Sequence, residues 1–197
     1  MTTTQPQNWT RGDYVVSTDP ALLQVDAINA ALSSDMVWWA GDLPADALRD
    51  ALQSSICFGL YHKKSPGMNG DSKTPGLWNL IDDIHRPGFA NSVQHIGGKA
   101  EQLEQVGLVR VITDGVTFGY LTDVYILPEH QKGGRGRWML EVLNEVLQSW
   151  PHLRRVMLLT TDKMHLFGKN LGMKDYREFD GMKGVSIAML EGPGAQH

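Results

Sequence analysis

Hydrophobic residues along the chain follow two spacings, the alternating runs typical of strands and the three-to-four-residue repeats typical of helices. Seven short segments have strand composition, and Asp114-Gly115 between two of them supplies the turn chemistry of a hairpin. We therefore expect the strands on either side of that turn to pair antiparallel. The expected strands cover residues 14–16, 56–61, 106–112, 116–127, 156–160, 174–179 and 185–190.

Helical spacing recurs in four segments. The clearest amphipathic helix follows Gly136, because its apolar residues fall on one face and its polar residues on the other. That apolar face consists of Met139, Leu140, Leu143, Val146, Leu147 and Trp150. A shorter helix has Asp162 as its candidate N-cap and Gly172 at its end. The expected helices cover residues 19–32, 45–53, 137–150 and 162–170.

Between residues 62 and 102 these spacings are lost. Gly, Ser, Asn, Pro and Lys are frequent there, and no element is predicted with any regular pattern. So polar an interval is typical of an insertion and not of a separate domain. We therefore expect a single domain over residues 1–197 that contains an insertion at residues 62–102.

Composition limits the classes of partner and compartment. Lys and Arg number 18 against 22 Asp and Glu, so the formal net charge of −4 provides no general attraction for nucleic acid or an anionic membrane. The single cysteine, Cys57, excludes an internal disulfide and every multi-thiolate metal site. His62, His85 and Asp82-Asp83 match no metal-ligand spacing, so no metal is expected. The polar amino terminus and the absence of about 18 consecutive apolar residues predict a soluble, cytoplasmic protein.

One loop concentrates glycine and positive charge. Gln131-Lys132-Gly133-Gly134-Arg135-Gly136 lies between a predicted strand and a helix start, and Arg137 follows it. Free main-chain N–H groups and the positive end of the helix dipole point the same way in such a turn, which favours a phosphate-bearing ligand. A nucleotide P-loop would need Gly-Lys-Ser/Thr at the helix start, and a dinucleotide fingerprint would need glycine where Met139 stands. Both of these alternatives are excluded.

The same loop resembles the Gln/Arg-x-x-Gly-x-Gly/Ala signature of the GNAT superfamily of acetyltransferases. Residues 121–130 look like the fourth strand of that family with its Pro-containing exit, and residues 165–173 are similar to a later family segment. The resemblance implies an α/β (α+β) fold. Its sheet would be mixed, mostly antiparallel and six- to seven-stranded, flanked by helices, with strands four and five splayed apart.

The resemblance also implies acetyl-CoA as acyl donor, wedged between strands four and five. Loop amides and the helix start would bind the pyrophosphate, and main-chain groups of Ile126 and Leu127 would hold the pantetheine arm. The implied coenzyme-binding residues are Ile126, Leu127, Gln131, Lys132, Gly133, Gly134, Arg135, Gly136 and Arg137. An amine bound opposite would attack the thioester directly, so that positioning supplies most of the catalysis and no metal is needed.

Direct transfer needs a group that takes the proton of the amine. An alkylamine has a pKa near 10, so about one molecule in a thousand is nucleophilic at neutral pH. Asp123 is the first candidate for this role, on a strand face shared with Leu121 and Tyr125. The alternative is that Asp123 anchors a neighbouring loop by hydrogen bonds.

The sequence departs from the family at Gly168, where a tyrosine often protonates the leaving thiolate. Tyr125, His165 and Tyr176 are candidate substitutes, although a histidine on a short helix is more often a surface residue. A thiolate with a pKa near 8.5 is a tolerable leaving group, so transfer does not depend on a general acid. The departure keeps open a module that binds acetyl-CoA without turnover.

The acceptor site is defined least well by the sequence. Trp39, Tyr61 and Asp123 are the candidate acceptor contacts, and core packing is the alternative for both aromatic residues. The leading function is N-acetylation of a primary amine on a small molecule, bound in a closed pocket that the polar interval caps. A protein amino terminus or lysine, bound in an open groove, is the alternative acceptor, and a homodimer is an open alternative for the assembly.

Overall fold

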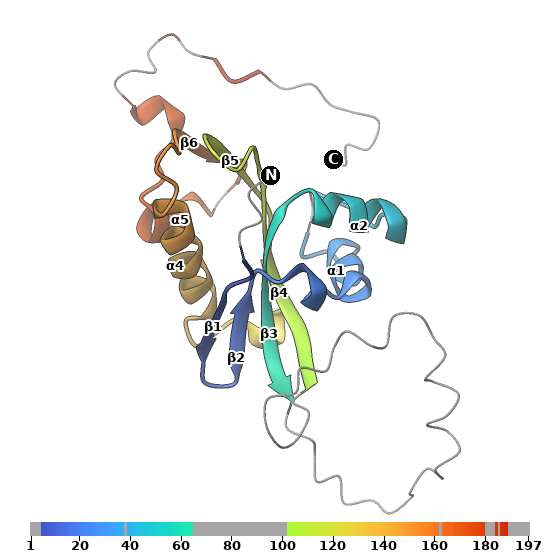
Figure 1. Cartoon of the computed structure of the whole chain (residues 1–197). Helices are drawn as coiled ribbons and strands as arrows, with labels where there is room; N and C mark the ends of the chain where they lie inside the picture. The colour runs from blue at the N-terminus through green and yellow to red at the C-terminus, as the bar shows by residue number, and fades with distance from the viewer. Residues whose placement is uncertain are drawn as a thin grey trace, which may run out of the picture.

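The computed structural model describes residues 5–37, 39–64, 102–161, 163–179, 184 and 186–188. Six strands form one sheet in the order β1-β2-β3-β4-β5-β6, and all neighbours are antiparallel except β5 and β6, which are parallel (Figure 1). This arrangement confirms the predicted mixed, mostly antiparallel sheet. The strands are β1 (Asn8–Arg11), β2 (Tyr14–Ser17), β3 (Ile56–Lys64), β4 (Gln102–Thr113), β5 (Phe118–Ile126) and β6 (Arg155–Leu158).

Helices cover both faces of the sheet. On one face lie α1 (Val25–Leu32) and α2 (Ala45–Gln53), and on the other lie α4 (Arg135–Gln148) and α5 (Met164–Leu171) (Figure 1). The described chain also has three 3-10 turns, η1 (Pro20–Leu22), η4 (Pro128–His130) and η5 (Tyr176–Glu178). None of the described helices combines the length and the apolar character needed to cross a membrane.

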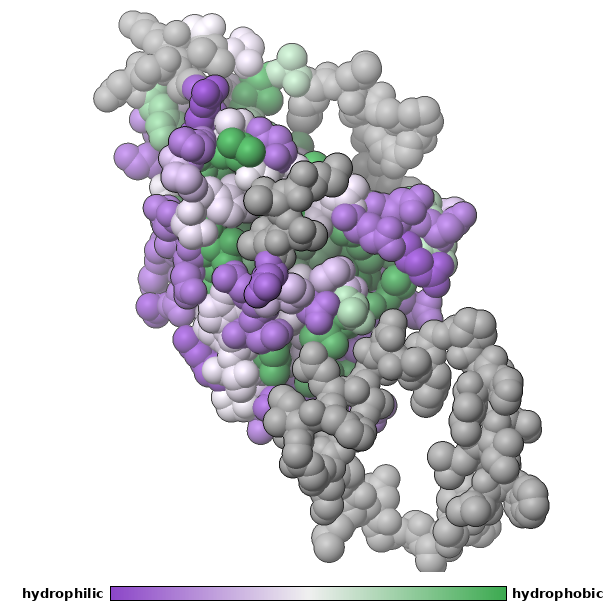
Figure 2. All heavy atoms as spheres, in the orientation of Figure 1, coloured by the Kyte–Doolittle hydropathy of each residue, from purple (hydrophilic) through white to green (hydrophobic). Residues whose placement is uncertain are grey.

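Two hydrophobic clusters hold these three layers together. Phe58 and Leu143 lie in the cluster between the sheet and α4, whereas Ile28, Leu52 and Leu108 lie in the cluster beneath α1 and α2. Each fully buried side chain of this kind contributes about 1.5–3 kcal/mol relative to leaving it exposed. Figure 2 shows hydrophilic residues over most of the described surface in this view, with apolar residues in small separate patches.

A tight turn joins β4 to β5, as predicted. Gly115 has a φ of 74°, and the Asp114 carboxylate accepts hydrogen bonds from the Thr117 hydroxyl and from the amides of Val116, Thr117 and Phe118. These hydrogen bonds hold the pKa of Asp114 well below its usual range, the Thr117 hydroxyl being the largest cause. The Thr117 carbonyl accepts from the amide of Arg154, so this turn also anchors the start of β6.

The sequence pattern located most elements but was wrong at three. It gave no sign of β1, which pairs with β2 across a turn at Gly12. Residues 174–179 were expected as a strand but contain η5, because the Asp175 side chain accepts from the amide of Arg177 and closes a helical turn. The expected helix at residues 19–32 is two elements, since Leu23 is extended and separates η1 from α1.

Several expectations concern residues outside the described part of the chain. Residues 186–188 are not in a strand, and the rest of the expected strand at 185–190 is not described. Asp162, the expected N-cap, and residues 65–101 of the expected insertion also lie outside the described residues. The ends of that insertion were misplaced, because residues 62–64 continue β3 and residue 102 begins β4.

Candidate functional site

A gap opens between β5 and β6 where their pairing stops. β6 pairs with Phe118 to Leu121 and ends at Leu158, whereas β5 continues to Ile126. Among the described residues, no strand pairs with residues 122–126 on the side of β6. Main-chain groups on that side therefore lack the partners that a continuous sheet would supply. The splay predicted for these two strands is confirmed.

β5 contains a β-bulge at Asp123. The pairing register shifts between Leu108 and Arg110 of β4, and Asp123 has a φ of 50°, which is uncommon for a non-glycine residue. The extra residue reverses the alternation of the strand, so that Leu121 packs in the cluster beneath α4 and Tyr125 in the cluster beneath α1 and α2. The predicted face shared by Asp123, Leu121 and Tyr125 is therefore wrong, because strict alternation does not survive the bulge.

The Asp123 carboxylate is engaged within the sheet. Its Oδ2 lies 2.6 Å from Nε of Arg110, and its Oδ1 accepts from the Thr122 hydroxyl at 3.2 Å. Both side chains of the ion pair are largely buried, at 9% exposed for Asp123 and 18% for Arg110. Arg110 Nη1 also donates to the Ser55 hydroxyl at 3.4 Å. This geometry favours the anchoring alternative for Asp123, because both carboxylate oxygens already accept hydrogen bonds within the sheet.

The glycine-rich loop leads into the start of α4, where several amides have no hydrogen-bond partner among the described residues. Gly133 and Gly134 have φ values of 70° and 76°, a conformation that only glycine adopts at little cost. Gly134 is the N-cap of α4, and its carbonyl accepts the first helical hydrogen bond, from the amide of Trp138 at 2.9 Å. The amides of residues 135–137 therefore have no acceptor inside the helix. They lie in its first turn, at the positive end of the helix dipole.

Space lies open above this helix start. A Cβ atom added at Gly134 would have no heavy atom within 4 Å, and one added at Gly136 would meet only the Ile126 side chain at 3.7 Å. The chain itself therefore does not require glycine at position 136. Close approach of a ligand to the amides is a physical reason for the missing side chain.

The side chains of the loop are used mostly within the protein. Arg135 donates to the carbonyls of Lys132 at 2.6 Å and His130 at 3.3 Å, and its guanidinium lies 4.1 Å from the centre of the Tyr14 ring. Arg137 pairs with Glu141 at 2.8 Å. Arg135 therefore stabilises the conformation of the loop through its hydrogen bonds to these two carbonyls. In the described part of the chain, Lys132 has no ion pair and extends the positive charge of the loop.

The main-chain groups of Ile126 and Leu127 are also partly engaged. Gln131 Nε2 donates to the Ile126 carbonyl at 2.9 Å. The amide of Leu127 donates to Val106 and its carbonyl accepts from the amide of His130, both at 2.9 Å. A ligand at these positions would use the second lone pair of each carbonyl or displace the exposed Gln131 side chain.

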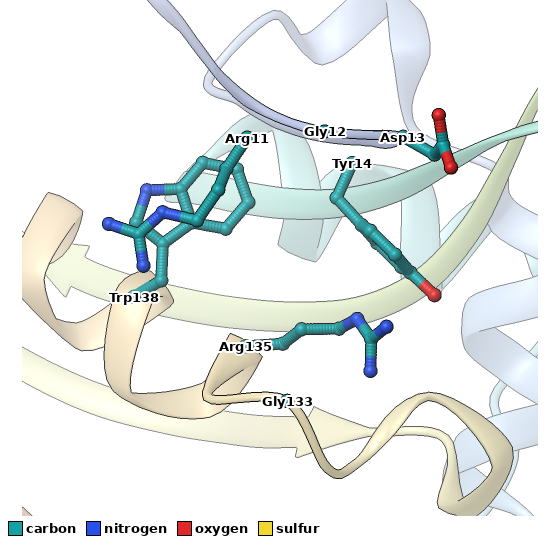
Figure 3. A pocket seen from close by; sticks show the side chains of 7 residues that line it. All are labelled: Arg11, Gly12, Asp13, Tyr14, Gly133, Arg135 and Trp138. Atoms are coloured by element: carbon teal, nitrogen blue, oxygen red, sulfur yellow. The ribbon is translucent and has the colours of Figure 1, made fainter.

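A pocket of about 280 Å³ lies on the flank of the helix start (Figure 3). The β1-β2 turn forms one wall with residues 11–14, and Gly133, Arg135 and Trp138 form the other. Arg11 lies 5.0 Å from the centre of the Trp138 ring and 3.4 Å from the Glu141 carboxylate. The sequence did not predict this contribution, because β1 was not recognised, although Arg11-Gly12-Asp13 is a turn signal.

Two of the three tyrosine candidates, Tyr125 and Tyr61, are buried, whereas Tyr176 is half-buried in η5. Tyr125 is 7% exposed, and burial raises the pKa of its hydroxyl, with the nearby Asp123 adding to the shift. Tyr61 is fully buried beside Val15 and Leu22, and its hydroxyl has no hydrogen-bond partner among the described residues. Tyr61 therefore does not line a surface site, and core packing is the role that the structure favours for it.

The remaining candidates lie apart from β5. Trp39 is 36% exposed in the loop between α1 and α2, and His165 is exposed on the first turn of α5. Gly168 sits in the last turns of α5, where an added Cβ would lie 3.2 Å from the Met173 carbonyl. Close packing at the end of α5 therefore occupies the space next to Gly168.

Cys57 is a core thiol. It lies beneath α1 and α2, and burial raises its pKa to about 12. The thiol therefore stays protonated at neutral pH and is a poor nucleophile.

Comparison with known proteins places this site in context. Residues 68–173 match the family described as the acetyltransferase (GNAT) family. A protein of Gibberella zeae, named as a candidate acetyltransferase, is 77% identical over 194 residues, which is 98% of each chain.

Solved structures share the fold. A crystal structure of a candidate GNAT acetyltransferase from Xanthomonas campestris has a TM-score of 0.56 and 25% identity, over 90% of this chain and 93% of that one. A GNAT-family acetyltransferase from Streptococcus pneumoniae has a TM-score of 0.50 and 16% identity, over 90% and 98% of the two chains.

Proposed function

Because the chain belongs to the GNAT acetyltransferase family, we propose that it transfers the acetyl group of acetyl-CoA to a primary amine, of a small molecule, in a ternary complex. The family assignment supports an acyltransferase activity. We propose in addition that acetyl-CoA is the donor and that a small-molecule amine is the acceptor. The observation that carries it is the row of amides at residues 135–137, which lack a hydrogen-bond partner in the described part of the chain and lie next to the gap between β5 and β6.

The coenzyme would lie across the start of α4. Its pyrophosphate would accept hydrogen bonds from the amides of residues 135–137, while Lys132 adds charge at the loop. The pantetheine arm would enter the gap beside β5, where residues 122–126 offer main-chain groups without a strand partner on that side. Gly136 fits this placement, because a side chain there would occupy the space of the pyrophosphate.

The chemistry then requires attack of the amine on the thioester carbonyl. The amine nitrogen forms the new C–N bond, the C–S bond breaks, and the nitrogen proton leaves to water or to a side chain. Tyr125 keeps its proton at neutral pH because burial raises its pKa, so it suits hydrogen-bond donation to the carbonyl oxygen or the departing sulfur. Asp123 would act by holding the bulge, or would carry the proton after releasing Arg110.

The acceptor would approach from the face of α1 and α2. Asp123 and Tyr125 lie toward that layer, and the loop between the two helices exposes Trp39. An aromatic ring and a buried carboxylate are suitable contacts for an amine with an apolar body. His165 stays a candidate for proton transfer on the other side of the gap.

The test is a pair of substitutions on one helix. Gly136→Asp places a carboxylate at the proposed pyrophosphate position, and an acidic residue in the first turn favours the helix, so the fold should be retained. We expect calorimetric titration to show at least a hundredfold loss of acetyl-CoA affinity. Gln148→Glu, which adds the same charge at the far end of α4, should leave the affinity unchanged. Equal affinities for both folded variants would show that the coenzyme does not bind here.

A coenzyme-binding module without turnover is the second candidate function. It is favoured by Gly168 at the position of the family tyrosine and by the Arg110 contact that occupies Asp123. Thiol release from acetyl-CoA with a panel of amines separates the two. Release with any amine supports the enzyme, whereas tight binding with no release for the whole panel supports the module.

A further inference from the structure

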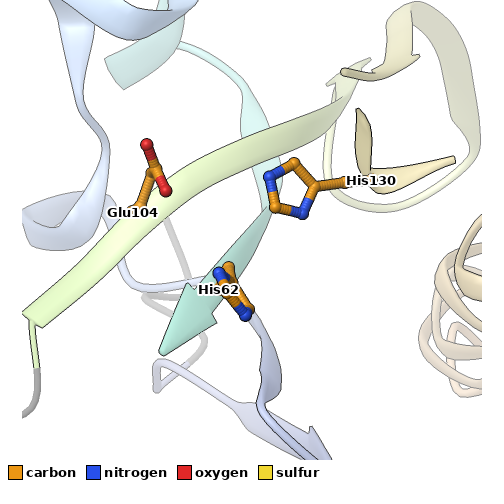
Figure 4. Close-up of side chains that lie close together, drawn as sticks. All are labelled: His62, Glu104 and His130. Atoms are coloured by element: carbon orange, nitrogen blue, oxygen red, sulfur yellow. The ribbon is translucent and has the colours of Figure 1, made fainter. Parts of the chain in front are cut away.

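Two histidines and a glutamate meet at one end of the sheet, outside the proposed coenzyme gap. His62 is near the end of β3, Glu104 is near the start of β4, and His130 is the last residue of η4 (Figure 4). Their ligand atoms all lie within 4.8 Å of one another, and all three residues are half-buried. The spacing of His62 and His85 in the sequence matches no metal-ligand motif. The fold instead brings His62 next to Glu104 and His130, which are distant from it in the chain.

The orientation of His130 suits metal binding. Its Nδ1 lies 2.9 Å from the Tyr14 hydroxyl, and the ring nitrogen on the other side points toward Glu104 in Figure 4. When Nδ1 carries the proton and donates it to the Tyr14 oxygen, Nε2 presents its lone pair to the cluster. A hydrogen bond to the other nitrogen is the usual device that orients a metal-bound imidazole.

We propose that His62, Glu104 and His130 bind a divalent transition-metal ion, of which Zn²⁺ is the representative, with water completing its coordination. Two imidazoles and one carboxylate are a donor set suited to Zn²⁺ and its neighbours, not to Mg²⁺ or Ca²⁺, which prefer oxygen ligands alone. Tetrahedral zinc sets its ligand atoms about 3.4 Å apart, so a pair within the 4.8 Å limit must close by roughly 1.4 Å at most. Half-buried side chains can make that adjustment by rotation.

The charges near the cluster are compatible with this ion. Glu104 pairs with Lys64 at 2.9 Å, but the Lys64 side chain is 50% exposed and can turn into solvent when a cation binds. The Tyr14 ring packs against both histidines, at 4.8 Å from His62 and 5.9 Å from His130 between ring centres. The aromatic ring therefore keeps both imidazoles near the proposed site in the absence of an ion.

An ion here would tie the base of the glycine-rich loop to the sheet. His130 lies directly before that loop, and its carbonyl accepts from Arg135. The metal would add a direct link from η4 to β3 and β4. The site does not depend on the proposed transferase function, because binding of an ion can be measured without acetyl-CoA.

The experiment is calorimetric titration of the full, tag-free chain with Zn²⁺, with Co²⁺ absorption as a second readout. We expect one equivalent to bind and a visible Co²⁺ spectrum with imidazole ligands to appear. His62→Gln, Glu104→Gln and His130→Gln should each weaken Zn²⁺ at least tenfold, and Tyr14→Phe should weaken it about tenfold through loss of the His130 hydrogen bond. His152→Ala, which removes a histidine outside the cluster, should bind as the unmodified chain does.

Imidazole NMR signals of the unmodified chain give a test that needs no variant. The chain has seven histidines, and one equivalent of Zn²⁺ should shift the signals of two of them, which disappear in turn from the spectra of the His62 and His130 variants. Absence of binding, equal affinity for all variants, or similar shifts for all seven histidines would each overturn the proposal.

Discussion

Arg110 determines what Asp123 can do. The guanidinium lies against a side chain that is 9% exposed, in a residue whose backbone is already in the left-handed region. A buried ion pair is costly to break, because the remaining charge has no water to replace its partner. The pair therefore stabilises the bulge, and the same contact occupies the group that the sequence marked as the proton acceptor.

Asp123→Asn should destabilise the protein by about 3 kcal/mol, because it leaves the Arg110 charge without its partner. The double variant Asp123→Asn with Arg110→Gln should regain most of that loss. Urea unfolding measures the stability of each variant, and thiol release measures their activity. Recovery of both properties in the double variant indicates an anchoring role. Stability that returns without activity would instead show that the carboxylate takes part in the transfer.

Elements with a regular hydrophobic repeat were predictable from the sequence, and those set by one polar contact were not. The helix after Gly136 and the β4-β5 hairpin appear as expected, because many buried side chains or a strong turn signal specify them. The bulge at Asp123 was missed, since one extra residue leaves no trace in an alternating pattern. η5 was missed because a single Asp175 side chain decides it.

The residues of the candidate site also divide into those that the sequence could predict and those that it could not. The glycine-rich loop was predictable, because φ values above zero restrict the residue type at Gly133 and Gly134. The internal use of Arg135 and Arg137 was not, since charge in a sequence does not show its partner. The contact between His130 and His62 depends on the whole sheet, so no local spacing could reveal it.

The β4-β5 hairpin should give the protein a distinct acid sensitivity. The folded pKa of Asp114 is lowered, so its contribution to stability is complete above the unfolded value of about 3.9 and is lost as the pH falls below it. Asp114→Asn should therefore be less stable than the unmodified chain at pH 7, and the difference should shrink below about pH 4. Urea unfolding across this range measures the difference. A difference that does not change with pH would contradict the role of the charged carboxylate.

At the scale of the whole molecule, two cores share one sheet, and the proposed coenzyme gap opens between its last two strands. β6 is joined to β5 by pairing at only four positions, Phe118 to Leu121, while α5 packs beside α4 in the same cluster. A ligand that fills the gap would contact both sides of this short junction. Binding should therefore stabilise the fold as a unit.

Acetyl-CoA at about one hundred times its Kd should add about 2.7 kcal/mol to the free energy of unfolding. For a chain of this size the thermal midpoint would rise by about 5–10 °C, which differential scanning fluorimetry can measure. Adenosine at the same concentration, which lacks the pyrophosphate, should leave the midpoint nearly unchanged. An equal rise with adenosine would mean that the amides of α4 contribute little.

The bulge in β5 makes the length of that strand as important as its composition. Each residue of β5 after Asp123 points to the face opposite to the one that strict alternation would give it. For this reason Tyr125 packs in the layer of α1 and α2, while Ile126 packs toward α4. Deleting one residue between Leu121 and Tyr125 would remove the bulge and leave these two side chains in their present layers, whereas inserting one more residue there would exchange them between the layers. Single-residue insertions in this stretch should therefore be far more harmful than substitutions at its exposed positions.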